Sequence, residues 1–253
     1  MQRNINNLSG FTIGATDGEI GKVEEFYFDD TTWTIRYMIV KTGGWLTGRE
    51  VLISPVAILA PDWESKIIPV NLTRKQVEDS PDIDTDKPIS RQEEEKLFAY
   101  YPWQSYYDAG LYGDGMGMMG VFPLAPLVTE EEIEQQEKNE APKKATHLRS
   151  THELKGYTIH AEDGEIGTVA DFILDDKTWQ VSFIVVKTGN LFSHKKVLIS
   201  PQWIKEVKWS VQEFMVSVNV EDVKNSPEYD ASKPVESSYT KDLHDHYGFS
   251  SNS

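Results

Sequence analysis

The chain has 253 residues, and its 41 acidic against 25 basic residues give a formal net charge of −16. An acidic chain is repelled by nucleic acid and by anionic membrane surfaces, so nucleic acid is not an expected partner. Cysteine is absent, which excludes disulfides, thiolate metal ligands and cysteine nucleophiles.

The hydrophobic fraction of 39% favours folded domains over disorder. The N-terminal residues have no apolar run of the kind that a targeting signal needs. The most apolar stretch, residues 116–128, is broken by glycine and proline, and it is shorter than the roughly 20 residues of a membrane-spanning helix. We expect a cytoplasmic protein without membrane insertion, for which peripheral association with a membrane stays open.

The first part of the chain has the pattern of a small β-domain. Asp17-Gly18 is a typical hairpin-turn dipeptide, because glycine accepts a positive φ without steric cost. Apolar and polar residues alternate over residues 33–40, which predicts a strand with one more apolar face. The apolar phase changes between Val23 and Phe26, and this change predicts a β-bulge that bends the sheet. A short helix is expected over residues 73–79.

The following segment, residues 89–150, has a different composition. Ser90 to Glu93 resembles a capping box, so a short helix is expected to run to about Tyr101. Residues 104–128 are rich in Tyr, Gly and Met without periodicity, which is typical of a loop. A second capping-box pattern starts at Thr129, but its helix would have no apolar face. We therefore expect a partly helical, acidic linker.

The beginning of the chain is repeated 146 positions later without a gap. TIGATDGEIGKV at residues 12–23 becomes TIHAEDGEIGTV at residues 158–169, and VLISP at residues 51–55 recurs at residues 197–201. A repeat in one register predicts two equivalent domains. We expect these domains at residues 5–88 and 151–234, joined by the linker at 89–150 and followed by a C-terminal tail at 235–253.

The short length of each copy has a structural consequence. A domain of about 80 residues buries little of its surface and is marginally stable alone. Two fused copies can cover each other's apolar ends. The repeat therefore predicts a pseudo-two-fold pair within one chain, or matching pairs between chains.

The order of these motifs resembles the PRC-barrel domain family. The residues that carry the resemblance are the apolar start Leu8-Ser9-Gly10-Phe11, the DGEIGKV segment, the turn Asp29-Asp30, Trp33 and the VLISP segment. The resemblance covers both copies. It implies a mainly β fold made of two small, strongly bent PRC-type β-barrels in tandem.

The resemblance also implies a class of function. Barrels of this family resemble interaction modules more than self-contained catalysts. The chain is thus expected to be a non-catalytic adaptor that binds protein partners or associates with itself as a homo-oligomer. Family members include the cytoplasmic domain of the photosynthetic reaction centre H subunit and the C-terminal part of a ribosome-maturation factor. Two alternatives follow, an accessory protein of a membrane electron-transfer complex and an assembly factor of the ribosome-maturation type.

The sequence contains no set of residues that predicts an active site. The paired acids Asp29-Asp30 and Asp175-Asp176 are expected in turns, where aspartate accepts hydrogen bonds from its own backbone. His244 and His246 are two positions apart, whereas a helical metal pair prefers a spacing of four. No nucleophile-elbow motif is present. We therefore expect no catalytic residue, no cofactor and no metal.

Two apolar pairs are the main candidates for contacts with a partner. Trp45-Leu46 and Leu191-Phe192 each follow a Lys-Thr-Gly motif, where a hairpin tip is expected. Such a pair either forms an exposed patch suited to a partner or folds back over the domain. The aromatic run from Tyr100 to Tyr107 is the second candidate surface, chiefly through Tyr100, Tyr101 and Trp103.

Overall fold

The computed structural model describes residues 1–46, 48–83, 89, 91–101, 147–189, 195–231, 233 and 235–248. These residues belong to two compact units, one formed by residues 1–88 and 147–253 and the other by residues 89–146. The second unit contains helix α2 (Arg91–Tyr100), which confirms the helix expected at the start of the linker. The loop expected at 104–128 and the helix expected from Thr129 lie outside the described residues.

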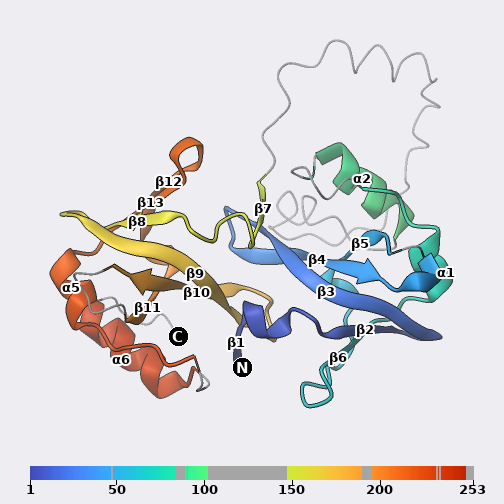
Figure 1. Ribbon diagram of the computed structural model, residues 1–253, viewed down its shortest axis with the longest axis horizontal. Helices are drawn as coiled ribbons and strands as arrows, with labels where there is room; N and C mark the ends of the chain where they lie inside the picture. The colour runs from blue at the N-terminus through green and yellow to red at the C-terminus, as the bar shows by residue number, and fades with distance from the viewer. Residues whose placement is uncertain are drawn as a thin grey trace, which may run out of the picture. The chain divides into compact units, whose positions relative to one another are not determined.

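The first copy of the repeat forms one sheet with the strand order β5-β4-β3-β2-β6 (Figure 1). A short strand from the start of the second copy, β7 (Leu148–Ser150), pairs with β3. All neighbours are antiparallel except β2 and β6, which run parallel. The strands of this copy are β2 (Thr12–Ala15), β3 (Gly18–Asp29), β4 (Thr34–Thr42), β5 (Glu50–Ile53) and β6 (Ile67–Pro69).

The second copy forms an equivalent sheet with the order β11-β10-β9-β8-β13-β12. The first strand of the chain, β1 (Gln2–Asn4), pairs with β9. Strands β8 and β13 run parallel, like β2 and β6. The strands of this copy are β8 (Thr158–His160), β9 (Glu165–Asp175), β10 (Val181–Thr188), β11 (Lys196–Ile199), β12 (Ile204–Lys208) and β13 (Glu213–Val216).

The predicted bulge is present in both copies. The register between β3 and β4 shifts between Val23 and Glu25, and the register between β9 and β10 shifts between Val169 and Asp171. Each long strand therefore turns its apolar face inward again after the bulge, and Phe26 is fully buried. The bulge allows apolar side chains from both ends of a long strand to face the same core.

Among the described residues, the strands of each copy do not close into a barrel, so the strongly bent barrels that the resemblance implies are present only as bent, open sheets. In the first copy β5 and β6 are the two ends of the sheet, and no ladder among the described residues joins them. Strand β5 ends at Ile53 because the next residues form a 3-10 turn, η3 (Pro55–Ala57), that begins with proline. Proline has no N–H with which to extend a ladder. The mainly β fold with two bent sheets is confirmed.

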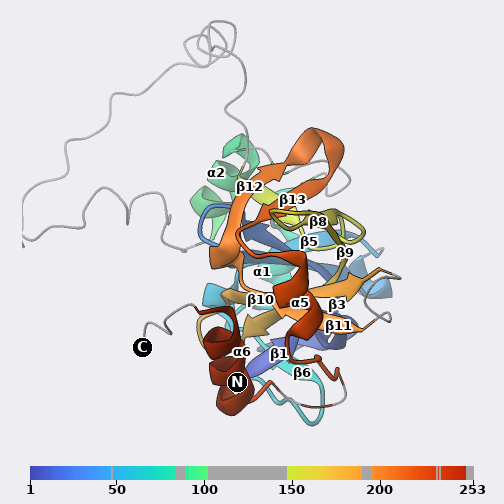
Figure 2. The same ribbon diagram turned by 90° about the vertical axis from the view of Figure 1, so that its left-hand side faces the viewer.

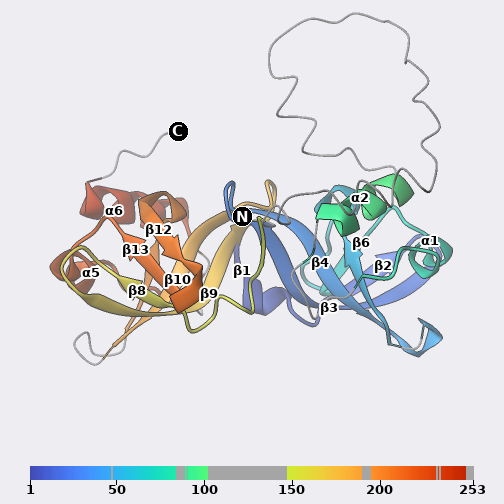
Figure 3. The ribbon, with the colours of Figure 1, turned by 90° about the horizontal axis from the view of Figure 1, so that it is seen from above.

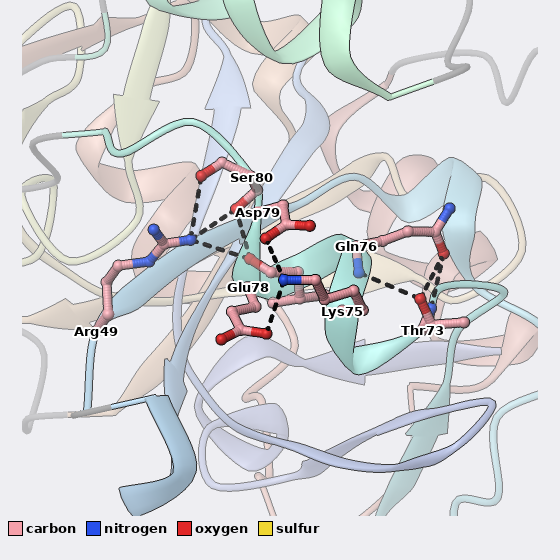
Figure 4. Close-up of polar contacts among 8 residues, drawn as sticks. Arg49, Thr73, Lys75, Gln76, Glu78, Asp79 and Ser80 are labelled. Atoms are coloured by element: carbon pink, nitrogen blue, oxygen red, sulfur yellow. Dashed lines mark hydrogen bonds and ion pairs between the residues drawn. The ribbon is translucent and has the colours of Figure 1, made fainter.

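A short helix follows the last strand of each copy, as expected. Helix α1 (Arg74–Glu78) begins with a capping box, in which the Thr73 Oγ1 accepts the Gln76 N–H and the Gln76 side chain accepts the Thr73 N–H (Figure 4). The Asp17 Oδ1 also accepts the Arg74 N–H at 2.8 Å. Helix α5 (Val220–Asn225) has the same arrangement with Asp163. The hairpin-turn aspartate thus also caps a helix.

The C-terminal segment, expected as a tail, contains a further helix, α6 (Ser237–Tyr247) (Figure 2). It lies 146 positions after α2, so the repeat continues past the expected domain bounds. The Tyr247 ring lies 4.5 Å from the ring of Trp203, which is buried in the second copy. Burial raises the pKa of Tyr247 to about 12. Helix α6 is therefore a packed part of the second copy.

Candidate interaction surfaces

The two copies exchange their first strands. Strand β1 precedes the first copy in the chain but pairs with β9 of the second copy (Figure 3), while β7 precedes the second copy and pairs with β3 of the first (Figure 1). The registers are equivalent, since Arg3 lies opposite Leu174 and Arg149 lies opposite Phe28. This reciprocal exchange agrees with the predicted pseudo-two-fold pair.

Each exchanged strand carries an arginine that contacts both copies. The Arg3 Nε donates to Asp176 Oδ2 at 2.6 Å, and its guanidinium lies 3.7 Å from the centroid of the Trp63 ring. Asp176 belongs to the second copy and Trp63 to the first. Planar guanidinium groups suit such a double contact, because they pair with carboxylates and stack on aromatic rings.

The other arginine repeats these contacts with the copies reversed. The Arg149 Nε donates to Asp30 Oδ2 at 2.9 Å, and its guanidinium lies 4.0 Å from the Trp209 ring centroid. His147 Nδ1 also lies 3.0 Å from Asp30 Oδ1. The second aspartate of each turn therefore belongs to the contact between copies.

The first aspartate of each turn has the structural role that we expected. Asp29 Oδ1 accepts hydrogen bonds from the N–H groups of Thr31 and Thr32 and from the Thr32 hydroxyl. Asp175 does the same for Lys177 and Thr178. Partial burial of Asp175 acts to raise its pKa, but these hydrogen bonds and the charge of the N-terminal ammonium hold the pKa below its usual value.

The turns after these aspartates meet each other directly. The Ile35 N–H donates to the Trp179 carbonyl at 2.8 Å, and the Val181 N–H donates to the Trp33 carbonyl at 2.7 Å. Both tryptophans have a φ near +57°, in the left-handed region that is uncommon for side chains other than glycine. Trp33 therefore ends the turn and is not the first strand residue that its alternating pattern predicted.

A buried carboxylate lies where the N-terminal segment crosses the second copy. Asp171 on β9 is 4% exposed, and its Oδ1 accepts the Phe172 N–H at 2.8 Å. Burial raises the pKa of Asp171, while hydrogen bonds from Phe172, the Asn6 backbone and the Asn4 side chain oppose the rise. At the equivalent place in the first copy, the Ser150 hydroxyl donates to Glu25 Oε2 at 2.5 Å. No local pattern predicts the pairing of Ser150 with Glu25, because the two residues lie far apart in the chain.

The hairpin tip of the first copy is where the Lys-Thr-Gly motif predicted it. The turn η2 (Gly44–Leu46) joins β4 to β5, and Leu46 is half-buried. The Trp45 side chain, Leu191, Phe192 and Trp103 lie outside what the structure describes. Of the other candidates, Tyr100 is 37% exposed and Tyr101 is 2% exposed.

The hairpin of the first copy is joined to the end of α1 by one side chain (Figure 4). The Arg49 Nη2 donates to the Val77 carbonyl at 3.0 Å, and to the carbonyl and hydroxyl of Ser80 at 3.3 and 2.8 Å. In the second copy Lys195 donates to the carbonyls of Lys224 and Ser226. A cation at the C-terminal end of a helix satisfies carbonyls that have no partner within the helix.

The first copy also exposes three apolar side chains that were not among the residues predicted to bind a partner. Val56 is 67% exposed, Leu59 is 51% exposed and Ile67 is 39% exposed. The buried Ile68 and Val70 face the core, so Ile67 on the same strand faces outward. We call Val56, Leu59 and Ile67 the apolar triad.

The second copy has polar residues at all three equivalent positions, Gln202, Lys205 and Glu213. Glu213 forms ion pairs with His160 at 3.5 Å and with Lys208 at 3.9 Å. The same position of one fold is therefore apolar in one copy and charged in the other. An alignment of the two copies would have revealed these positions, because a residue that is apolar in one copy and charged in the other is not required by the core.

The described residues give no indication of a metal centre, because no group of three or more His, Asp and Glu side chains among them could hold an ion. None of the described helices has the length and apolar character needed to cross a membrane.

Comparison with known families agrees with the repeat. A family model described as PRC-barrel domain matches residues 1–77 and 147–217, which together make up more than half of the chain. Both matches include the exchanged strands β1 and β7, which precede the expected domain starts at 5 and 151. No curated protein matches the chain.

Proposed function

The chain belongs to the PRC-barrel domain family, and on that premise we propose that it is a non-catalytic adaptor whose first copy binds a protein partner. PRC-barrel domains are generally non-catalytic. A fold by itself does not define a function, so the proposal depends on a surface of this particular chain.

The observation that carries the proposal is the difference between the two copies. Three exposed positions are apolar in the first copy and polar in the second, although the backbone is equivalent. The fold therefore does not require apolar residues there. Exposed apolar groups cost solubility, and clusters of them mark contact surfaces. The apolar triad is the surface that we assign to a partner. The hairpin tip with Trp45 and Leu46 is a second, separate candidate.

The charge of the chain limits the kind of partner. A net charge of −16 repels acidic surfaces, so we expect a protein with a neutral or basic contact face. We place the protein in the cytoplasm as part of the same proposal.

Affinity capture from host cells with the full chain tests the proposal. The variant Val56→Gln/Leu59→Lys/Ile67→Glu gives the first copy the residues of the second. We expect this variant to lose a protein that the unchanged chain captures reproducibly. The matched control is Gln202→Ala/Lys205→Ala/Glu213→Ala in the second copy, which should retain it. Equal capture by all three chains would contradict the assignment of the triad.

The hairpin tips need a separate capture experiment. Trp45→Ala/Phe192→Ala tests the two tips that the sequence predicts. Loss of the same partner in this variant would extend the contact surface from the triad to the tips, and unchanged capture would remove the tips from the proposal.

A further inference from the structure

The described contacts between the two copies are made by residues outside 89–146. Backbone hydrogen bonds join β1 to β9 and β7 to β3, and others join the turns at Trp33 and Trp179. The residues that make these bonds all lie within 1–46 and 147–189.

The exchanged segments also bury apolar side chains against the opposite copy. Strand β1 continues into the 3-10 turn η1 (Ile5–Leu8), which lies against β9. Ile5 and Leu8 are each 2% exposed, and at the start of the second copy Leu148 and Leu154 are 1% and 0% exposed. Separation of the copies would expose part of this apolar surface to water, which is unfavourable in proportion to the area.

The contact is self-complementary. Arg3 with Asp176 and Arg149 with Asp30 are the same pair with the copies exchanged. Such an isologous contact needs only two copies of one domain type, whichever chain supplies them. The linker only raises the local concentration of one copy near the other, to the order of millimolar for a flexible connection.

We infer that each copy binds a second PRC-barrel copy non-covalently through the exchanged N-terminal strand, so that the pair persists without the linker and also forms between copies of different chains. This inference is independent of which outside partner the apolar triad binds. The recognition element is an extended strand whose arginine pairs with the second aspartate of the partner copy's turn.

The experiment starts from the full chain with a protease site inserted between residues 113 and 120, which is cut after purification. At micromolar concentration we expect both fragments to sediment together, with the mass of the uncut chain and an unchanged circular dichroism spectrum. Separate sedimentation of the fragments, or unfolding after the cut, would overturn the inference.

Two charge variants test the mechanism in the cut protein. Arg3→Glu/Arg149→Glu should weaken the fragment pair by about tenfold or more for each arginine, because interface charge pairs of this kind carry substantial coupling. Lys177→Glu, one residue from Asp176, makes the same change of charge as either arginine substitution alone, but outside the contact, and should have little effect. Equal weakening by both variants would mean that net charge and not the exchanged pair holds the copies together.

A mixing experiment tests pairing between chains. Cut protein with an affinity tag after residue 253 is incubated with untagged cut protein, because the ammonium of Met1 pairs with Asp176 in the contact itself. Recovery of untagged first-copy fragment with the tagged second-copy fragment is expected. Failure of exchange over days, while the fragments remain paired, would overturn the part of the inference that concerns different chains.

Discussion

Arg149 and Asp30 are 119 positions apart in the chain, yet the Arg149 Nε donates to Asp30 Oδ2 at 2.9 Å. Both side chains are largely shielded, with 18% and 10% of their surface exposed. The bond joins the first strand of the second copy to the turn of the first. It is therefore a direct contact between the two copies.

Arg149→Ala should lower the free energy of unfolding by about 1–3 kcal/mol, since the shielded Asp30 carboxylate loses the donor to its Oδ2 and keeps only the His147 contact at Oδ1, and since a cation–π contact is removed. Arg149→Lys should recover only part of the loss, because an ammonium cannot stack as a planar group. Urea denaturation measures both. Lys177→Ala is the control and should be neutral. Full recovery by lysine would show that charge alone matters at this position.

Gly21 on β3 lies opposite Thr42 on β4, where no space is left for a side chain. A Cβ at Gly21 would lie 2.0 Å from the Lys41 carbonyl oxygen, and one at Gly167 would lie 2.2 Å from the Lys187 carbonyl oxygen. Gly21→Ala should therefore destabilise the protein by about 3 kcal/mol or more, because backbone must move.

The matched control for this prediction is Gly14→Ala. Its Cβ would meet only the Ile67 Cγ2, at 3.6 Å, which is an ordinary contact. We expect little change in the thermal midpoint for Gly14→Ala and a large decrease for Gly21→Ala. Similar midpoints for the two variants would contradict the close approach of β3 and β4.

Asp171 should make the stability depend on pH. Burial raises its pKa in the folded protein above the value in the unfolded chain. The folded state therefore binds the proton more tightly, and the stabilisation from this proton is complete below the unfolded pKa. It is lost as the pH rises through the folded pKa.

Asp171→Asn removes this titration while keeping an oxygen for the Phe172 N–H. We expect the variant to be more stable than the unchanged chain above the folded pKa and to show a flatter profile in the acidic range. Denaturation midpoints measured from pH 4 to 8 provide the test. Glu165→Gln, an exposed carboxylate on the same strand, is the control. A profile that Asp171→Asn leaves unchanged would argue against this assignment.

Arg49 joins the first hairpin to the end of α1 (Figure 4). Arg49→Ala should cost about 1–2 kcal/mol, because it removes a charged donor from the Val77 carbonyl, which keeps its Ser80 donors, and from the carbonyl and hydroxyl of Ser80. Arg49→Lys should retain most of the stability, since Lys195 serves the same helix end in the second copy. Chemical denaturation distinguishes the two variants. An equal loss for lysine and alanine would show that the guanidinium shape, and not the positive charge, is required.

The sequence predicted the repeat, the strands, the bulge and the capped helices because each of them is a local pattern. The exchange of strands has no such pattern. Gln2–Asn4 and Leu148–Ser150 are three residues long, too short for a period to be visible. The pairing depends on contacts between distant parts of the chain. The sequence therefore predicted a pseudo-two-fold pair of copies but not the exchange of their first strands.

The apolar triad was missed in the sequence for a different reason, although an alignment of the two copies shows polar residues at its three positions in the second copy. Isolated Val, Leu and Ile residues in a β-domain are most simply assigned to the core. Leu59 and Ile67 are exposed in the structure, and the second copy has the charged residues Lys205 and Glu213 at the same positions. These two facts together show that Leu59 and Ile67 do not belong to the core. Burial is a property of the folded chain, so it enters the argument only with the structure.

The triad makes a prediction that separates binding from stability. Val56→Gln/Leu59→Lys/Ile67→Glu changes exposed side chains only, so the free energy of unfolding should change by less than about 1 kcal/mol. Ile68→Ala, at a fully buried neighbour of Ile67, should cost about 2–4 kcal/mol. Urea denaturation of the two variants gives the comparison. A large loss of stability in the triple variant would place the triad in the packing of the first copy, and its exposed surface could then not be assigned to a partner.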